Sequence, residues 1–323
     1  MENRDEAPEM EISLPRSARK ARSACLPLTT QGADNGAALG ATPSVKSIVK
    51  SNAMAHFICT TCGTQYAETA ALPDECRICL DERQYVGLSG QSWTTLDQIR
   101  RTHWTTIRAM ESGLIGIGME PKFAIGQRAL LVQSPQGNVL WDCIPLLDES
   151  LVEMLKALGG LTAIAISHPH YYSTMVEWSQ AFGCPILVHA ADRQWVMRQD
   201  CNVTFWDGET KVIGDGLTLV RCGGHFEGGT VLHWRDGAAG RDALLSGDIL
   251  QIVPDRHWVS FMYSYPNLIP VPASTVQRIV EAVEPFEFDR IYGAWRDMSV
   301  EQDAKATVSR SAERYIAAIN RPT

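Results

Sequence analysis

His168 and His170 are separated by one residue and follow the apolar run LTAIAI almost directly. On an extended chain, side chains two apart point to the same side, so the two imidazoles project together from the end of a predicted strand. Imidazole is a common ligand of zinc and iron. By itself the pair is equally typical of two hydrogen-bonded core histidines.

The same arrangement recurs at two other apolar segments. The run LTLVRCGG precedes His225, which lies in the glycine-rich stretch GGHFEGG, and the run ALLSG precedes Asp248. Glycines let the backbone approach a ligand closely, and α/β proteins build their sites at the carboxyl ends of strands. Three imidazoles and one carboxylate suit one zinc or ferrous ion. We therefore expect His168, His170, His225 and Asp248 to form a metal site.

Four cysteines indicate a second, separate metal site. Cys59 and Cys62 form one C-x2-C pair, and Cys76 and Cys79 form another after thirteen intervening residues. Two such pairs present four thiolates at the corners of a tetrahedron, which leaves no position for a substrate water. The pattern resembles a zinc ribbon or rubredoxin knuckle and predicts a structural zinc site over residues 56–85. Iron is the alternative metal.

Composition restricts the class of protein. The 323 residues carry a formal charge of −8, so the whole chain has no electrostatic footprint for nucleic acid. Met1 is followed by an acidic segment rather than by a secretory signal, and the longest apolar run is too short to span a bilayer. Nine cysteines without a signal indicate a reducing compartment. We expect a cytoplasmic protein.

The chain divides into four predicted segments. Residues 1–53 contain no aromatic side chain and are predicted to be a disordered tail or leader. Beyond the four-cysteine unit, residues 86–112 are predicted to be a linker with a helix around LDQIRRTHWTTIRAM. Residues 113–323 alternate predicted strands and helices, which favours stacked sheets covered by helices.

From about Leu114 to Trp295 the sequence resembles the metallo-β-lactamase superfamily. The resemblance is carried by WDC after the first predicted hairpin, by SHPH, by GGHFEGGT and by SGD. It implies a four-layer αββα sandwich. It also implies that His168, His170 and His225 hold a first metal ion, and that Asp248 takes the position that bridges to a second ion in the family.

Three positions depart from the family pattern. Tyr172 and Ser173 stand where the family motif H-x-H-x-D-H has aspartate and histidine, and Trp295 lies near the position of the last histidine. The ligands that belong only to the second metal are therefore missing, and a one-metal site is implied. Asp248 is then either a fourth ligand or the base that takes a proton from water. Tyr172 either stabilises a developing oxyanion or fills the vacated metal position by packing.

His257 lies in the aromatic stretch DRHWVSFMYSYPN. It and Trp295 are candidates for the wall of a substrate pocket. The alternative for His257 is a packed surface loop.

These observations favour a metal-dependent hydrolase of a small ester, thioester, lactone or related acyl compound. The alternative is a non-hydrolytic metal-binding or ligand-binding protein with the same fold. A third hypothesis is a nucleic-acid processing factor, which the acidic charge and the loss of a two-metal site disfavour. We expect a small-molecule substrate as the partner and no association with a membrane. A homo-oligomer is an open alternative to a monomer.

Overall fold

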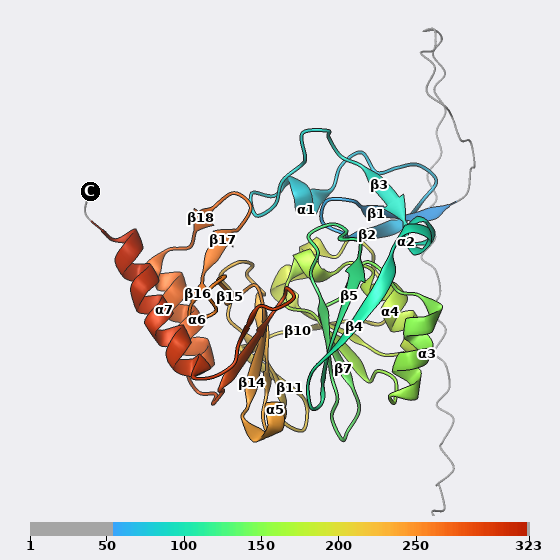
Figure 1. Ribbon diagram of the computed structural model, residues 1–323. Helices are drawn as coiled ribbons and strands as arrows, with labels where there is room; N and C mark the ends of the chain where they lie inside the picture. The colour runs from blue at the N-terminus through green and yellow to red at the C-terminus, as the bar shows by residue number, and fades with distance from the viewer. Residues whose placement is uncertain (1–53, 322–323) are drawn as a thin grey trace, which may run out of the picture. The chain divides into compact units, whose positions relative to one another are not determined.

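The computed structural model describes residues 54–321 (Figure 1). The predicted disordered tail, residues 1–53, lies outside the described residues. Within the described range two β-sheets face each other, and helices cover the outer face of each sheet. This is the αββα arrangement that the sequence resemblance implies.

The first sheet has seven strands in the order β10-β9-β8-β7-β6-β5-β4. Neighbouring strands are antiparallel from β4 to β7 and parallel from β7 to β10. The strands are β4 (Trp104–Glu111), β5 (Leu114–Glu120), β6 (Ala129–Val132), β7 (Val139–Trp141), β8 (Ala163–Ala165), β9 (Ile186–His189) and β10 (Val203–Trp206).

The second sheet has six strands in the order β11-β12-β13-β14-β19-β20. Only β14 and β19 pair in parallel. The strands are β11 (Thr210–Gly214), β12 (Leu217–Arg221), β13 (Thr230–Trp234), β14 (Ala243–Gly247), β19 (Arg290–Gly293) and β20 (Ser299–Val300).

Alternation along the strands divides the core into three layers. Leu130 packs between the two sheets, whereas its neighbour Leu131 packs under the helices on the first sheet. On the second sheet, Leu245 packs between the sheets and Leu244 faces the opposite helices. Successive side chains of a strand point to opposite faces, so both faces of each sheet are buried. Burial on both faces explains why these strands are continuous apolar runs.

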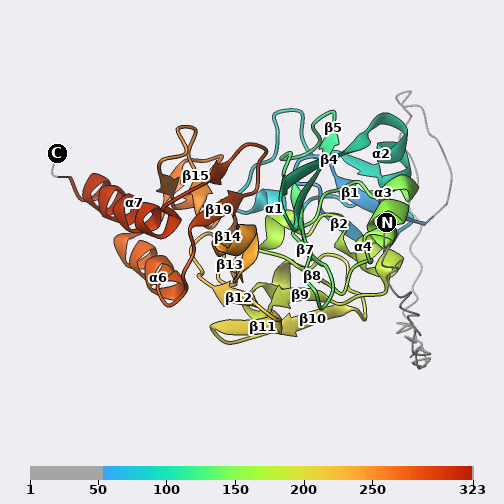
Figure 2. The ribbon, with the colours of Figure 1, turned by 60° about the horizontal axis from the view of Figure 1, so that its bottom comes forward.

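Two pairs of helices form the outer layers. α3 (Glu149–Ala157) and α4 (Met175–Phe182) contribute to the core on the first sheet. α6 (Ala273–Val283) and α7 (Ala304–Ile319) lie side by side on the second sheet (Figure 2). Asp148 caps α3, because its carboxylate accepts a hydrogen bond of 2.8 Å from the backbone N–H of Leu151.

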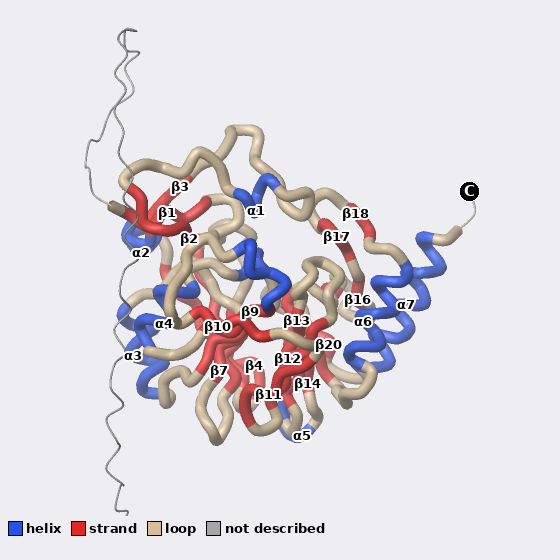
Figure 3. The backbone as a smooth tube through the Cα atoms, turned by 180° about the vertical axis from the view of Figure 1, so that it is seen from behind, coloured by secondary structure: helices blue, strands red, loops and turns tan. Residues whose placement is uncertain are grey.

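The four-cysteine unit forms a small three-stranded sheet in the order β2-β1-β3, along one edge of the two large sheets (Figure 3). Its elements are β1 (Ala55–Cys59), β2 (Gln65–Thr69), α1 (Arg77–Leu80) and β3 (Trp93–Thr95), and α2 (Leu96–Thr102) follows. The remaining elements of the described chain are short: two 3₁₀ turns (Pro169–Tyr171 and Ala190–Trp195), α5 (Gly237–Gly240), β15 (Gln251–Ile252), β16 (Val259–Ser260), β17 (Met262–Ser264) and β18 (Ile269–Pro270).

Two sequence expectations differ from the structure. The expected helix in 86–112 ends at Thr102, and Trp104–Glu111 is instead the edge strand β4, which pairs with β5. Its β-branched residues suit a pleated surface, and pairing with a neighbour prevails over the helical pattern. The pattern YYSTMVEWSQAFG predicts a helix from Tyr171, but α4 begins only at Met175, because Ser173 has a left-handed φ of 43°. None of the helices within residues 54–321 combines the length and apolar character that a membrane span requires.

The cap of α3 makes a stability prediction. Asp148→Ala removes the acceptor for the Leu151 N–H and also the partner of the Thr105 hydroxyl, which donates a 3.0 Å bond to the same carboxylate. We expect the free energy of unfolding to fall by about 1–2 kcal/mol, measured by urea denaturation. Ser150→Ala, on the exposed face of the same turn, is the matched control, with an expected change of about 0.5 kcal/mol or less. Equal losses in the two variants would contradict the capping role.

Candidate metal centre

Segments far apart in the sequence bring the four predicted ligands together. His168 follows β8, His170 lies in the 3₁₀ turn, His225 follows β12 and Asp248 follows β14. One ligand atom from each lies within 4.8 Å of every other. No member of this group, which we call the histidine cluster, is more than 4% exposed.

The geometry of the histidine cluster fits a metal ion. His168 Nε2 lies 3.1 Å from Asp248 Oδ1, and His225 Nε2 lies 3.1 Å from His170 Nδ1. His168 Nε2, His170 Nε2 and Asp248 Oδ1 are nevertheless buried without a hydrogen bond of acceptable geometry. Buried polar atoms of a native protein normally have partners. Three nitrogens and one oxygen that converge in this way suit zinc or ferrous iron.

Neighbouring groups orient the imidazoles. Ser167 Oγ lies 2.9 Å from His168 Nδ1. His225 Nδ1 donates a 2.7 Å hydrogen bond to the carbonyl oxygen of Tyr263, which leaves Nε2 of His225 free to bind a metal. The segment that carries His168 is itself held by Asp142, whose Oδ1 accepts a 2.8 Å bond from the backbone N–H of Ser167.

Gly247 permits the approach of β14 to this segment. Its φ is +54°, and a Cβ at this position would lie 2.6 Å from Ser167 Oγ. A side chain here would therefore push Asp248 away from His168. The glycine in the SGD motif has a steric function.

Burial determines the charge of the cluster. It lowers the pKa of His168 and His170 well below the ordinary value and lowers that of His225 to about 4. The three imidazoles are therefore neutral near pH 7, the state in which imidazole binds a metal. Burial also raises the pKa of Asp248 to about 7 in the metal-free chain, against the opposing effect of the Tyr171 hydroxyl.

The four cysteines also converge as expected. All four are buried, and their ligand atoms lie within 4.8 Å of one another. Cys59 Sγ lies 3.6 Å from Cys79 Sγ, and Cys62 Sγ lies 3.6 Å from Cys76 Sγ, which is far longer than a disulfide bond. Contacts with the neighbouring thiols lower the pKa of Cys59, so one thiolate forms readily. The set fits a tetrahedral structural metal.

The residues at the expected second-metal positions have hydrogen-bond partners of their own. Ser173 Oγ accepts a 3.0 Å hydrogen bond from Gln127 Nε2. The Tyr172 hydroxyl donates to the carbonyl oxygen of Asp192 at 3.5 Å. Trp295 packs against the core under α3 and α4 and donates to the carbonyl oxygen of Ile125. These contacts agree with the packing alternative for Tyr172 and give none of the three a role in metal binding.

Tyr171, rather than Tyr172, lies beside the histidine cluster. Its ring centroid is 4.4 Å from that of His168, and its buried hydroxyl lies close to the Asp248 carboxylate. The 3₁₀ turn after His168 directs Tyr171 toward the cluster. The side-chain alternation of an extended chain does not predict this direction. The contacts of Tyr172 agree with its packing alternative, and a catalytic role for this residue stays a prediction.

Two further residues differ in their relation to the histidine cluster, and His257 agrees with its surface-loop alternative. His257 is exposed in the loop between β15 and β16 and does not belong to the histidine cluster. Arg83, from the four-cysteine unit, does reach the cluster, because its Nη1 donates to the carbonyl oxygen of His225 at 3.4 Å. No sequence signal could reveal this contact between segments so far apart.

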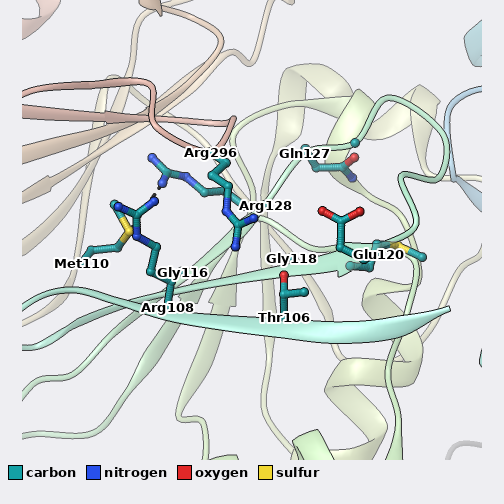
Figure 4. Close-up of a pocket in the computed structure, with 11 residues that line it drawn as sticks. Thr106, Arg108, Met110, Gly116, Gly118, Glu120, Gln127, Arg128 and Arg296 are labelled. Carbon is teal, nitrogen blue, oxygen red and sulfur yellow. Dashed lines mark hydrogen bonds between the residues drawn. The ribbon is translucent and has the colours of Figure 1, made fainter.

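A separate cavity of about 70 Å³ lies over β4 and β5 (Figure 4). Arg108, Arg128 and Arg296 line one part of it and Glu120 another. Burial lowers the pKa of the Arg128 guanidinium to about 10. No member of the histidine cluster lines this cavity, so it is not the metal centre.

Comparisons with known proteins place the chain among relatives. No protein-family model matches it. YmaE of Bacillus subtilis (strain 168), described as an uncharacterized protein, is 50% identical over 269 residues, which are 83% of this chain and 98% of YmaE.

Solved structures share the fold. The crystal structure of VMB-1 has a TM-score of 0.50 at 9% identity, over 67% of this chain and 98% of that one. The DIM-1 metallo-β-lactamase, in a crystal exposed to ceftazidime, has a TM-score of 0.50 at 11% identity, over 66% and 97%. At these identities the likeness shows the fold alone.

Metal analysis of the purified full chain tests both sites. We expect about two metal ions per chain, one at the cysteines and one at the histidine cluster. His168→Ala should retain about one ion, because it removes a ligand from one site only. His257→Ala is the matched control and should retain about two. A content of about three ions in the wild-type chain, or an unchanged content in His168→Ala, would contradict the one-metal cluster.

Proposed function

We propose that the chain is a metal-dependent hydrolase. It belongs to the same family as YmaE, and its metallo-β-lactamase fold supports this function. The proposed substrate is a small acyl compound, such as an ester, thioester or lactone. The observation that supports this function most directly is the convergence of neutral imidazoles and one carboxylate with buried, unpartnered ligand atoms.

The chain's own residues have distinct proposed roles. His168, His170 and His225 hold a single zinc or ferrous ion. When bound, this ion polarises a carbonyl oxygen and lowers the pKa of water to about 7. Asp248 is the fourth ligand or receives a proton from water. Phe226, 1% exposed and packed on the imidazoles, excludes bulk water from the cluster.

A second candidate is a non-hydrolytic metal-binding protein. One specific observation favours it: the cluster offers four protein ligands, each nearly fully buried. Four ligands complete a tetrahedron, as in structural zinc sites, whereas catalytic sites keep a position open. Hydrolysis then requires either a fifth position at the metal or Asp248 as the base rather than as a ligand.

Turnover of 4-nitrophenyl acetate by the full chain distinguishes the two candidates. We expect turnover that is lost on chelation and restored by zinc or ferrous iron. His168→Ala should lower kcat/KM by about a thousandfold or more, because the ion provides the electrophile and the activated water.

His257→Ala, an exposed histidine outside the cluster, is the control and should retain wild-type turnover. Turnover that survives both chelation and His168→Ala would refute the hydrolase assignment. A metal-loaded chain that turns over neither this ester nor a thioester would favour the second candidate.

A further inference from the structure

The four-cysteine unit contributes a segment to the metal centre of the large domain. Residues 81–84 directly follow α1, and Asn267 in the β17–β18 loop holds them (Figure 1). The side-chain Nδ2 of Asn267 donates to the carbonyl oxygens of Glu82 and Gln84, at 2.8 and 2.9 Å. Because Arg83 lies between the two anchored residues, its backbone position is fixed relative to the histidine cluster.

The Arg83 guanidinium packs among aromatic rings next to the cluster. Its central carbon lies 3.9 Å from the ring centroid of Phe226, 5.2 Å from that of Trp195 and 5.3 Å from that of Tyr263. Phe226 in turn contacts the imidazoles, with its ring centroid 5.0 Å from that of His170. Contacts with three rings restrict the position of the guanidinium.

One nitrogen of Arg83 is left for a further partner. Asp81 accepts hydrogen bonds from Nε and Nη2, at 2.5 and 2.8 Å. Nη1 has the weaker contact with the carbonyl oxygen of His225, at 3.4 Å. Asp192, the other carboxylate that acts on Arg83, accepts a hydrogen bond from the backbone N–H of Gly228.

The charge and exposure of Arg83 suit an anion. Its side chain is 11% exposed, whereas that of His168 is fully buried, so Arg83 is more accessible to a ligand from solvent than His168 is. A partly buried ion pair adds little stability over apolar packing, so stability alone does not explain a charge here. With three neutral imidazoles and one carboxylate, a divalent ion keeps surplus positive charge, which adds to the attraction for an anion.

We propose that Arg83 is a specificity-determining residue that binds a carboxylate of the substrate through Nη1. The four-cysteine unit then forms part of the substrate site, and a metal held by Cys59, Cys62, Cys76 and Cys79 would stabilise the turn that precedes this residue. That the bound carboxylate belongs to a substrate rests on the proposed hydrolase function. Binding of a carboxylate by Arg83 does not depend on that function.

Calorimetric titration of the metal-loaded full chain with glutarate tests binding without turnover. Arg83→Gln should weaken glutarate binding by about tenfold or more, which corresponds to about 1.4 kcal/mol. Arg77→Gln, an exposed arginine of the same unit, is the matched control and should bind as the wild type does. Asp81→Asn should bind glutarate at least as tightly as the wild type, because it removes the competing carboxylate. Metal content and thermal unfolding show whether each variant is folded.

A pair of esters tests specificity. The ratio of kcat/KM for mono-4-nitrophenyl glutarate to that for 4-nitrophenyl acetate should fall by about tenfold in Arg83→Gln and recover in part in Arg83→Lys. Failure of both esters refutes the hydrolase and leaves the glutarate titration to decide the role of Arg83. A wild-type chain that binds no glutarate, or equal binding by Arg83→Gln, overturns the proposal.

Discussion

The structure depends on the burial of four metal-ligating side chains that the polypeptide alone does not satisfy. His168, His170, His225 and Asp248 lie in the interior, yet three of their nitrogen and oxygen atoms have no hydrogen-bond partner. A buried polar atom without a partner costs about 1–3 kcal/mol. A cation at the centre of the cluster would offset this cost for His168 Nε2 and Asp248 Oδ1, which lie 3.1 Å apart. The two facing sheets bring the ends of β8, β12 and β14 to one place and so create the site.

The positions that the resemblance assigns to second-metal ligands carry side chains with hydrogen bonds of their own. Where the superfamily motif is expected to have aspartate and histidine, the chain has Tyr172 and Ser173. Gln127 donates both to Ser173 and to the carbonyl oxygen of Cys143, and Tyr172 bonds to backbone. These neutral groups need no metal to be buried. The hydrogen bonds of Ser173 and Tyr172 agree with the proposed one-metal cluster.

The four-cysteine unit contacts the large domain close to the histidine cluster. Asn267 binds the backbone of its 81–84 segment, and Arg83 lies against Phe226 beside the histidine cluster. A metal at the cysteines would stabilise the turn from which this segment leaves. The two candidate metal sites are thus linked through a few residues of chain, which gives the unit a place in the proposed substrate site.

The sequence by itself predicted the fold class, through its resemblance to the metallo-β-lactamase superfamily, and the two groups of candidate metal ligands that the described structure brings together. Apolar strands ending in ligand residues, and closely spaced cysteine pairs, are local patterns. Only the tertiary structure decided that Tyr171 rather than Tyr172 faces Asp248, because a 3₁₀ turn rotates the chain after His168. It also decided that 104–111 is an edge strand and that Arg83 reaches His225. The edge strand and the Arg83 contact both depend on contacts between segments that are distant in the sequence. A local pattern of residues does not predict such contacts.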